Sequence, residues 1–308
     1  MTAPGTPPSA AAAAPVAEVS AQRVRTAAGE TNWRLRSAGR GPLVLLLHGT
    51  GASLHSFAPL IDSLRGECRL LAPDLPGHGG TDALPAAGTS LAGFGRAIAS
   101  LLAARGERPA MVVGHSAGVA VALRMILDGD LPPVPLLSVN GAPLPLGGLA
   151  GRWFAPAARL VAEQGLVARL VARRASAAGV VERLIGSTGS RLSGAAVAPY
   201  RELMTQPRHV AGALRMMANW DLPALERDLH RVRSTVVLLH GDRDRTLPPG
   251  YADRVHRALP DAEVVRLADL GHLAHEERPD RVAPWVRRLL AAAPAGDCDT
   301  LAASPVER

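Results

Sequence analysis

Short apolar runs, each bounded by glycine, proline or charged residues, recur along the chain between residues 43 and 267. A continuous apolar run of about four to eight residues is typical of a strand that is buried on both faces of a sheet. We therefore predict six strands, at Leu43–Leu47, Arg69–Ala72, Ala110–Val113, Val134–Val139, Thr235–Leu239 and Val264–Leu267.

Stretches with apolar residues at helical spacing separate several of these runs. Leu91–Arg105 shows this spacing, Ala117–Leu127 follows a turn bounded by glycine, and Asp280–Leu290 closes the domain. Because short buried strands that alternate with helices build parallel sheets, we predict an α/β fold with a mostly parallel central sheet flanked by helices.

The interval from residue 144 to 215 breaks this alternation. It contains amphipathic stretches such as Arg159–Val171 but no convincing strand, so we predict a helical insertion between two sheet strands, called the lid below. The lid divides the core into residues 23–143 and 216–291. Residues 1–22 and 292–308 are rich in Ala, Pro, Ser and Thr, and we expect them to be mobile tails.

The composition excludes several classes of protein. Hydrophobic residues make up 47% of the 308 residues and charged residues 20%, as in a soluble globular protein. No apolar run reaches the length of about 18 residues that a membrane span needs, and the N-terminal residues do not resemble a signal peptide. Cys68 and Cys298 are too few for a disulfide framework and lack metal-ligand spacing. We expect a cytoplasmic protein with neither a metal nor a cofactor.

The candidate chemistry begins with Gly114-His-Ser-Ala-Gly118, which fits the pattern G-x-S-x-G. The pattern stands directly after a predicted strand and before a predicted helix, which is the context of a nucleophile elbow. The glycines beside Ser116 let the backbone of a strained turn approach its neighbours closely. The alternative is a glycine-rich turn in which Ser116 only caps the helix.

A second glycine-containing turn, His48-Gly-Thr-Gly51, follows the first predicted strand. Its backbone amides reach the same edge of the sheet as Ser116, so we expect the Thr50 and Ala117 amides to form an oxyanion hole. The Gly51 amide remains an alternative to that of Thr50, and a simple tight turn is the structural alternative. We expect His48 to support this loop rather than act as a base.

A serine hydroxyl needs a base to take its proton and an acid to orient that base. The chain order in nucleophile-elbow enzymes is serine, acid, histidine. Two loops at the carboxyl ends of later predicted strands supply the candidates, Asp242 or Asp244 for the acid and His272 or His275 for the base.

These residues lie in blocks that resemble the α/β-hydrolase superfamily over about residues 30–291. The resemblance implies that Asp244 is the acid and His272 the base. Relatives that open epoxides or remove halogens use an aspartate at the elbow, where this chain has Ser116. The blocks are His48-Gly-Thr-Gly-Ala-Ser, Asp74-Leu-Pro-Gly-His-Gly, Gly114-His-Ser-Ala-Gly, Gly241-Asp-Arg-Asp and Gly271-His-Leu-Ala-His-Glu-Glu-Arg-Pro.

A narrower resemblance rests on the segments 139–142, 186–191 and 209–222. They are similar to the magnesium-chelatase accessory proteins of bacteriochlorophyll biosynthesis. This implies a role near magnesium insertion into protoporphyrin in a phototrophic bacterium, with a small hydrophobic or porphyrin-like substrate and magnesium-chelatase subunits as partners.

Two functions remain open from the sequence. The first is ester hydrolysis by Ser116, His272 and Asp244. The second is a non-catalytic accessory that binds a porphyrin or a chelatase subunit, with a lid pocket lined by Met204, Met216, Met217 and Trp220. The alternative for these four residues is packing within the core of the lid.

The net positive charge of the chain lies in the lid. The net charge is +7 and every basic side chain is arginine, a bias that a GC-rich genome imposes through its codons. Aromatic residues make up only 3%, so we expect no nucleic-acid binding. Residues 144–215 contain ten arginines and three acidic residues, so the lid alone carries +7 and the rest is neutral. Such a lid would attract porphyrin propionates, an acidic partner or an anionic membrane surface. The alternative is that its arginines lie on a solvated helix face that binds nothing.

Overall fold

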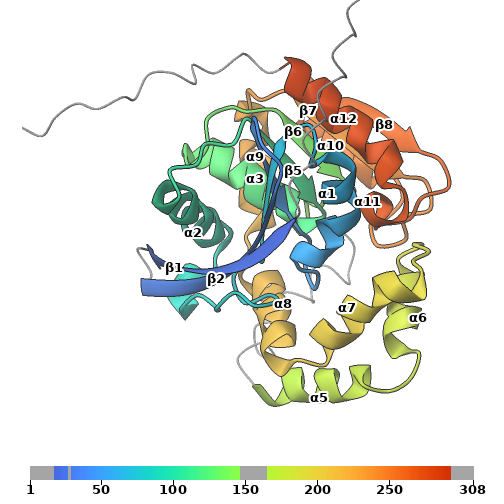
Figure 1. Ribbon diagram of the computed structural model, residues 1–308. Coiled ribbons are helices and arrows are strands. Elements are labelled where there is room, and N and C mark those ends of the chain that lie inside the picture. The colour runs from blue at the N-terminus through green and yellow to red at the C-terminus, as the bar shows by residue number, and fades with distance from the viewer. Residues whose placement is uncertain (1–16, 27–28, 146–164, 293–308) are drawn as a thin grey trace, which may run out of the picture.

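The computed structural model describes residues 17–26, 29–145 and 165–292, which fold around one eight-stranded sheet (Figure 1). Along the sheet the strands follow the order β1-β2-β4-β3-β5-β6-β7-β8. The pairs β1–β2 and β2–β4 are antiparallel and all other neighbours are parallel. The strands are β1 (Glu18–Thr26), β2 (Gly29–Ala38), β3 (Leu43–Leu47), β4 (Arg69–Pro73), β5 (Met111–His115), β6 (Leu136–Val139), β7 (Val236–Gly241) and β8 (Glu263–Leu267).

The predicted fold class and all six predicted strands are confirmed, since each apolar run forms one of the strands β3 to β8. All five residues of β3 and all five of β5 are buried. This explains why central strands were visible in the sequence as unbroken apolar runs.

The first two strands were not predicted. Residues 18–22 pair with β2, so the prediction that they belong to a mobile tail is wrong. β1 escaped detection because Val24 is its one fully buried hydrophobic side chain, and an edge strand of mostly polar residues carries little apolar signal. At the other end, residue 292 is the last of helix α12. The tail residues 1–16 and 293–308 lie outside the described residues.

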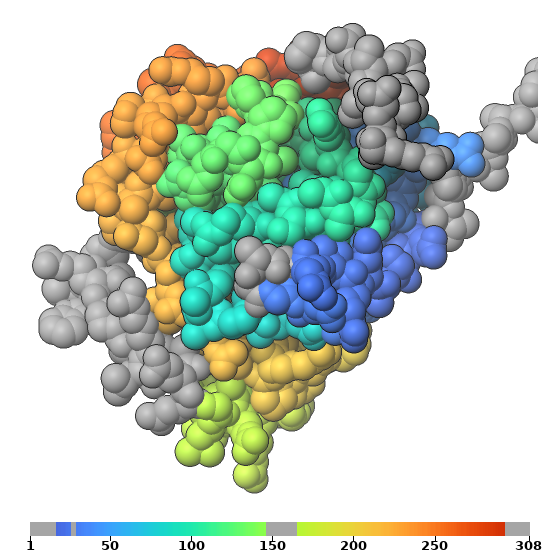
Figure 2. Space-filling model, turned by 90° about the vertical axis from the view of Figure 1, so that its left-hand side faces the viewer, coloured from blue at the N-terminus to red at the C-terminus, as the bar shows by residue number. Residues whose placement is uncertain are grey.

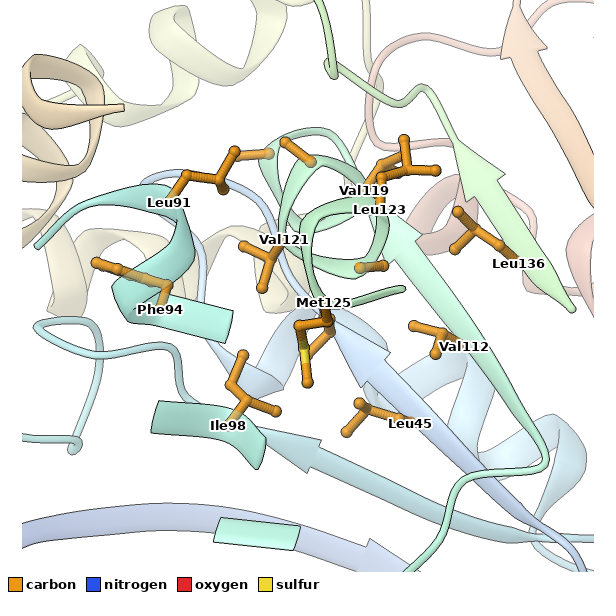
Figure 3. Close-up of a cluster of buried hydrophobic side chains, with 14 of the residues drawn as sticks. Leu45, Leu91, Phe94, Ile98, Val112, Val119, Val121, Leu123, Met125 and Leu136 are labelled. Carbon is orange, nitrogen blue, oxygen red and sulfur yellow. The ribbon is translucent and has the colours of Figure 1, made fainter. Parts of the chain in front are cut away.

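Helices cover both faces of the sheet. Leu45 and Val112 pack toward α2 and α3 on one face, whereas Val44 and Leu46 pack toward α1 and α12 on the other. Figure 3 shows the first of these clusters, with Leu91, Phe94 and Ile98 of α2 beside Val119, Val121, Leu123 and Met125 of α3. The helices of the core are α1 (Ala58–Leu64), α2 (Leu91–Ala104), α3 (Ala117–Asp128), α9 (Leu222–Asp228), α10 (Tyr251–Ala258), α11 (Ala274–Glu277) and α12 (Pro279–Ala292).

The described part of the lid is helical, as predicted. It consists of α5 (Gly165–Ala175), α6 (Val180–Ser187), α7 (Gly194–Met204) and α8 (Pro207–Asn219), which lie together beyond one end of the sheet (Figures 1 and 2). Residues 146–164, which the prediction also placed in the lid, lie outside the described residues. Helix α8 continues past the predicted boundary at residue 215 and ends where Trp220 adopts an extended conformation.

The lid sits on the carboxyl ends of the parallel strands. A Cβ added to Gly212 of α8 would lie 2.0 Å from the Gly77 carbonyl oxygen, in the loop after β4. A Cβ added to Gly271, after β8, would lie 2.4 Å from the carbonyl carbon of Gly189, which follows α6. Backbones this close require glycine, so the lid is fixed over the edge where α/β sheets place their sites.

Candidate active site

Ser116 occupies the sharp turn between β5 and α3 that its motif predicts. Its φ is 48° and its ψ is −116°, a strained conformation for a residue with a side chain. The turn is held because the Ser116 amide donates to the Val139 carbonyl at 3.1 Å and the Ala142 amide donates to the Ser116 carbonyl at 3.0 Å. A Cβ at Gly118 would lie 2.1 Å from the Leu47 carbonyl oxygen, so glycine is required there.

Asp244 and His272 are in direct contact at the same edge of the sheet. The His272 Nδ1 lies 2.8 Å from Asp244 Oδ2, and the Asn140 side-chain amide donates to that oxygen at 2.6 Å. The other oxygen, Oδ1, accepts the backbone amides of Thr246 and Leu247 at 2.8 and 3.1 Å. Burial alone would raise the pKa of Asp244, but the hydrogen bonds from His272 and Asn140 and the charge of His272 lower it on balance. Asp244 is therefore ionised, and its carboxylate is placed to orient the ring of His272.

The structure separates the two pairs of alternatives. The Asp242 side chain is exposed, and it is Asp244 that contacts His272. His275 is fully buried, with its ring 5.0 Å from that of Phe57 and 4.4 Å from that of His115. Burial lowers the pKa of His275 to about 3, so it packs as a neutral ring behind the site.

Contacts between loops bring Ser116, His272 and the turn after β3 together. The Nε2 of His115, the residue before Ser116, lies 3.0 Å from the His272 carbonyl oxygen. From the other side, a Cβ added to Gly49 would approach the Ser116 Cβ to 3.0 Å. The residues predicted from separate motifs thus meet at the carboxyl ends of β3, β5, β7 and β8.

The turn after β3 is organised by His48. Its Nε2 accepts the Leu75 amide at 2.8 Å, so the proton is on Nδ1, which donates to the Gly49 carbonyl at 2.8 Å. Burial lowers the pKa of His48 well below its usual value, which keeps the ring neutral in this role. Ala117 is the first residue of α3, where amides have no partner within the helix. Its amide is therefore available to a negatively charged oxygen.

Helix α8 of the lid forms hydrogen bonds with the same turn. His209 accepts the Gly79 amide at Nδ1 (3.1 Å) and donates from Nε2 to the Gly51 carbonyl at 3.1 Å. Burial lowers the pKa of His209, consistent with a neutral ring that both accepts and donates. About two turns further along α8, Met216 accepts a hydrogen bond at its sulfur from the Thr50 hydroxyl at 3.0 Å. The lid thus fixes the loop expected to stabilise an oxyanion.

The loop after α6 holds the other side of the site. The Thr188 carbonyl accepts the amides of Arg245 and His272 at 3.1 and 3.3 Å, and the Ser190 hydroxyl accepts the Leu273 amide at 2.8 Å. This loop therefore fixes the backbones that carry Asp244 and His272. The two lid segments and the segment around Asn140 are those on which the narrower family resemblance rests.

The four residues of the predicted lid pocket do not form one lining. Met216 is buried in the core cluster against Thr50, and Met204 packs with the separate cluster around Tyr200 and Val197. Trp220 packs against the same core cluster as Met216, edge-on to Phe94 with ring centroids 5.3 Å apart, whereas Met217 is 37% exposed. The helical spacing of these side chains did not reveal that they point toward different neighbours.

Four polar residues of the site region were missed as functional candidates, namely Asn140, His209, Tyr200 and Glu276. Tyr200 of α7 donates to Glu276 at 2.5 Å, and burial raises the pKa of Glu276 to about 8. Asn140 follows a predicted strand, so its position at the sheet edge was a usable signal. His209 and Tyr200 lie on lid helices and bond to core residues far away in the sequence, and no local pattern reveals such pairs.

In the described parts of the chain, no group of three or more His, Cys, Asp or Glu side chains could hold a metal ion. Cys68 is a buried free thiol, and Cys298 lies outside those parts. None of the described helices is both long and apolar enough to cross a membrane.

Comparisons with known proteins bear on the fold and the family of the chain. Residues 44–285 match the family model described as "Alpha/beta hydrolase family". The "Magnesium-chelatase 30 kDa subunit" of Rhodobacter capsulatus is 38% identical over 83% of this chain and 90% of its own length. The pimeloyl-[acyl-carrier protein] methyl ester esterase of Aromatoleum aromaticum is 31% identical over 78% of this chain and 94% of its own. A thermophilic esterase of Thermogutta terrifontis shares the fold, with a TM-score of 0.69 at 24% identity, covering 89% of this chain and 99% of its own.

Proposed function

Because the chain belongs to the alpha/beta hydrolase family, we propose that it is a serine hydrolase that cleaves a carboxylic ester. The observation that carries the proposal is the contact of 2.8 Å between Asp244 and His272, at the edge where Ser116 occupies a strained turn. A histidine oriented in this way can act as a base for a neighbouring hydroxyl.

The reaction would follow the roles that these positions allow. His272 takes the proton of the Ser116 hydroxyl through Nε2 as the oxygen attacks the ester carbonyl. Asp244 accepts the Nδ1 hydrogen, fixes the tautomer and stabilises the imidazolium, while the Thr50 and Ala117 amides stabilise the oxyanion. His272 then protonates the departing alcohol, and a water molecule activated by the same ring releases the acid from Ser116.

The lid supports this chemistry by limiting motion at the site. His209 and Met216 hold the turn that carries Thr50, and Thr188 holds the backbone of His272. Because oxyanion stabilisation depends on donors that are already in place, these contacts would contribute to rate rather than only to stability.

We place the reaction in bacteriochlorophyll biosynthesis, near the insertion of magnesium into protoporphyrin. The support is the similarity to a protein named as a magnesium-chelatase subunit, together with the position of the resembling segments around the site. The substrate would be a small hydrophobic or porphyrin-like ester, and chelatase subunits would be partners.

Hydrolysis of p-nitrophenyl esters of increasing acyl length tests the catalytic proposal. The wild type should release p-nitrophenol with saturation kinetics, and Ser116→Ala should lower kcat by about 10⁴-fold or more. Ser187→Ala, which truncates an exposed serine of the lid, is the matched control and should retain full activity. Equal rates for the wild type and Ser116→Ala would contradict a role for this serine.

A second candidate is a non-catalytic accessory that binds a porphyrin or a chelatase subunit, favoured by the name of the Rhodobacter capsulatus relative. Titration with protoporphyrin IX and with its magnesium complex should then shift the porphyrin absorption band in both the wild type and Ser116→Ala. Retention of purified chelatase subunits by the immobilised protein tests the partner. This candidate would be rejected if Ser116→Ala lost ester hydrolysis while the wild type bound neither the porphyrins nor the chelatase subunits.

A further inference from the structure

Helix α5 packs against the protein with its smallest side chains. Ala168, Ala172 and Ala175 are buried, with exposures of 3%, 2% and 8%, whereas Leu166 and Leu170 are 73% and 63% exposed. A surface helix of a globular protein turns its large apolar residues inward and its polar residues outward. The large apolar residues of α5 are turned the opposite way.

Arginines border these leucines. With about 100° between successive residues, Leu166 and Leu170 lie about 40° apart on the outer face, with Arg169 and Arg173 on one side and Arg174 on the other. All three arginines are exposed, and none forms an ion pair with any described residue. Helix α5 itself contains no acidic residue. The outer face therefore combines an apolar centre with an uncompensated positive border.

Exposure of this kind is concentrated in the lid. Of the six large hydrophobic side chains that are exposed among the described residues, five belong to lid helices and Val19 of β1 is the sixth. Among the described elements, helix α5 lies at the end of the lid that points away from the sheet (Figure 1). A flat surface could reach α5 without meeting the core.

We propose that the outer face of α5 binds an anionic membrane surface, a role that goes beyond ester hydrolysis. Leu166 and Leu170 would enter the boundary between headgroups and acyl chains, while Arg169, Arg173 and Arg174 contact lipid phosphates. A convex helix with a leucine stripe between arginines matches helices that lie in the membrane interface. The positive border makes an anionic leaflet the complementary partner, since it attracts each nearby arginine.

Binding at α5 would orient the molecule on the membrane. The lid would lie between the lipid and the sheet edge that carries Ser116, since α8 joins α5 to the loops of the site. A hydrophobic substrate dissolved in the bilayer would then be delivered to the side of the molecule that carries the site. This orientation does not require that the protein hydrolyse esters.

Co-sedimentation of the full chain with vesicles tests the proposal. The protein should bind vesicles of phosphatidylglycerol and phosphatidylcholine in equal parts, but not pure phosphatidylcholine, and raising salt from about 0.1 M to about 1 M should weaken binding. Replacing Arg169, Arg173 and Arg174 with Gln should lower the partition coefficient about a hundredfold, at about fivefold per arginine. Leu166→Ser with Leu170→Ser should lower it at least about tenfold.

The matched control removes three other exposed arginines, Arg40, Arg108 and Arg257, which lie outside the lid and form no ion pair with the described residues. This variant has the same net charge as the lid variant and should keep most of the binding. The proposal would be overturned if the wild type did not bind anionic vesicles, or if the two arginine variants lost vesicle binding equally. An acidic protein would then be the alternative partner of the outer face of α5. Circular dichroism verifies that each variant is folded.

Discussion

The edge of the sheet and the lid are built on different principles. At the edge, each chemical group stands within a few residues of the end of a buried strand, as Ser116 stands after β5 and Asp244 after β7. In the lid, each important contact joins residues far apart in sequence, such as His209 with Gly51 and Tyr200 with Glu276. The edge therefore carries the reactive groups, and the lid determines how firmly they are held.

The lid also differs between its two sides. Its inner side meets the core through close backbone contacts and buried polar groups, as at Gly212 and His209. Its outer side exposes Leu166 and Leu170 beside arginines. We therefore expect substitutions at the sheet edge to change mainly the rate, those on the inner side of the lid to change stability as well as rate, and those on its outer side to change neither.

Apart from removal of Ser116 or His272, the largest effect on rate is expected for Asp244→Asn. Without the carboxylate, His272 loses the group that fixes its tautomer and stabilises its positive charge, so kcat/KM should fall by about 10⁴-fold. Asp242→Asn is the control, because Asp242 is exposed and lies in the same loop. The rate of ester hydrolysis gives kcat/KM for both variants. An equal loss in the two variants would mean that the loop matters but the contact with His272 does not.

The neighbouring methionines Met216 and Met217 separate the inner side of the lid from the outer. Met216 is 1% exposed and touches Thr50, so Met216→Ala should lower the free energy of unfolding by about 2–5 kcal/mol. Met217 is 37% exposed, and Met217→Ala should change it by less than about 0.5 kcal/mol. Urea unfolding gives both values. Similar losses would show that the two side chains do not differ in burial in solution.

The glycine contact between α8 and the loop after β4 offers a third comparison. Gly212→Ala forces a methyl group against the Gly77 carbonyl and should lower stability by about 1–3 kcal/mol. Gly186→Ala adds the same methyl group where no other atom lies within 4 Å, and should be neutral or raise stability by up to about 1 kcal/mol. Thermal unfolding of the two variants measures the difference. A stable Gly212→Ala protein would show that the lid is not held closely there.

A fourth comparison concerns pH. Burial lowers the pKa of His55 to about 4 and those of His78 and His275 to about 3. The unfolded chain binds these protons at about pH 6.5, so the stabilising contribution is complete above that pH and is lost as the pH falls toward the folded values. For Glu276, whose pKa is raised to about 8, the contribution is present below about pH 4.5 and is lost as the pH rises through 8.

Urea unfolding across this range checks the two directions. Glu276→Gln should remove much of the decline between about pH 4.5 and 8, because no buried carboxyl remains to ionise beside Tyr200. Glu202→Gln, at an exposed position of the lid, should leave the decline unchanged. A decline over this pH range that is equally steep in the wild type and both variants would assign it to groups other than Glu276.

Much of the core could be predicted from the sequence, because a strand buried on both faces is an unbroken apolar run. The same reasoning failed for β1, because it is the edge strand of the sheet and few of its side chains are buried. The pairing of residues 18–22 with β2 depends on the sheet that later residues build, so no local pattern in that segment indicates it.

For the candidate site, the residues could be predicted from the sequence, but not all of their contacts. Ser116, Asp244 and His272 each follow a strand in a motif of a few residues, and parallel strands bring such loops to one edge. Asn140 shares that placement, yet its bond to Asp244 depends on which strands are neighbours in the sheet. The orientation of Met204, Met217 and Trp220 depends on how lid helices pack, which their spacing in the chain does not determine.

The most direct test of the central claim is labelling with a fluorophosphonate, which bonds covalently to a serine hydroxyl activated by a neighbouring base. Mass spectrometry of the labelled, digested wild type should place the adduct on Ser116. Ser116→Ala should not be labelled, and Asp244→Asn should be labelled much more slowly while remaining folded. A folded wild-type protein that resists the probe, or an adduct that persists in Ser116→Ala, would contradict the assignment of this edge of the sheet as a serine hydrolase site.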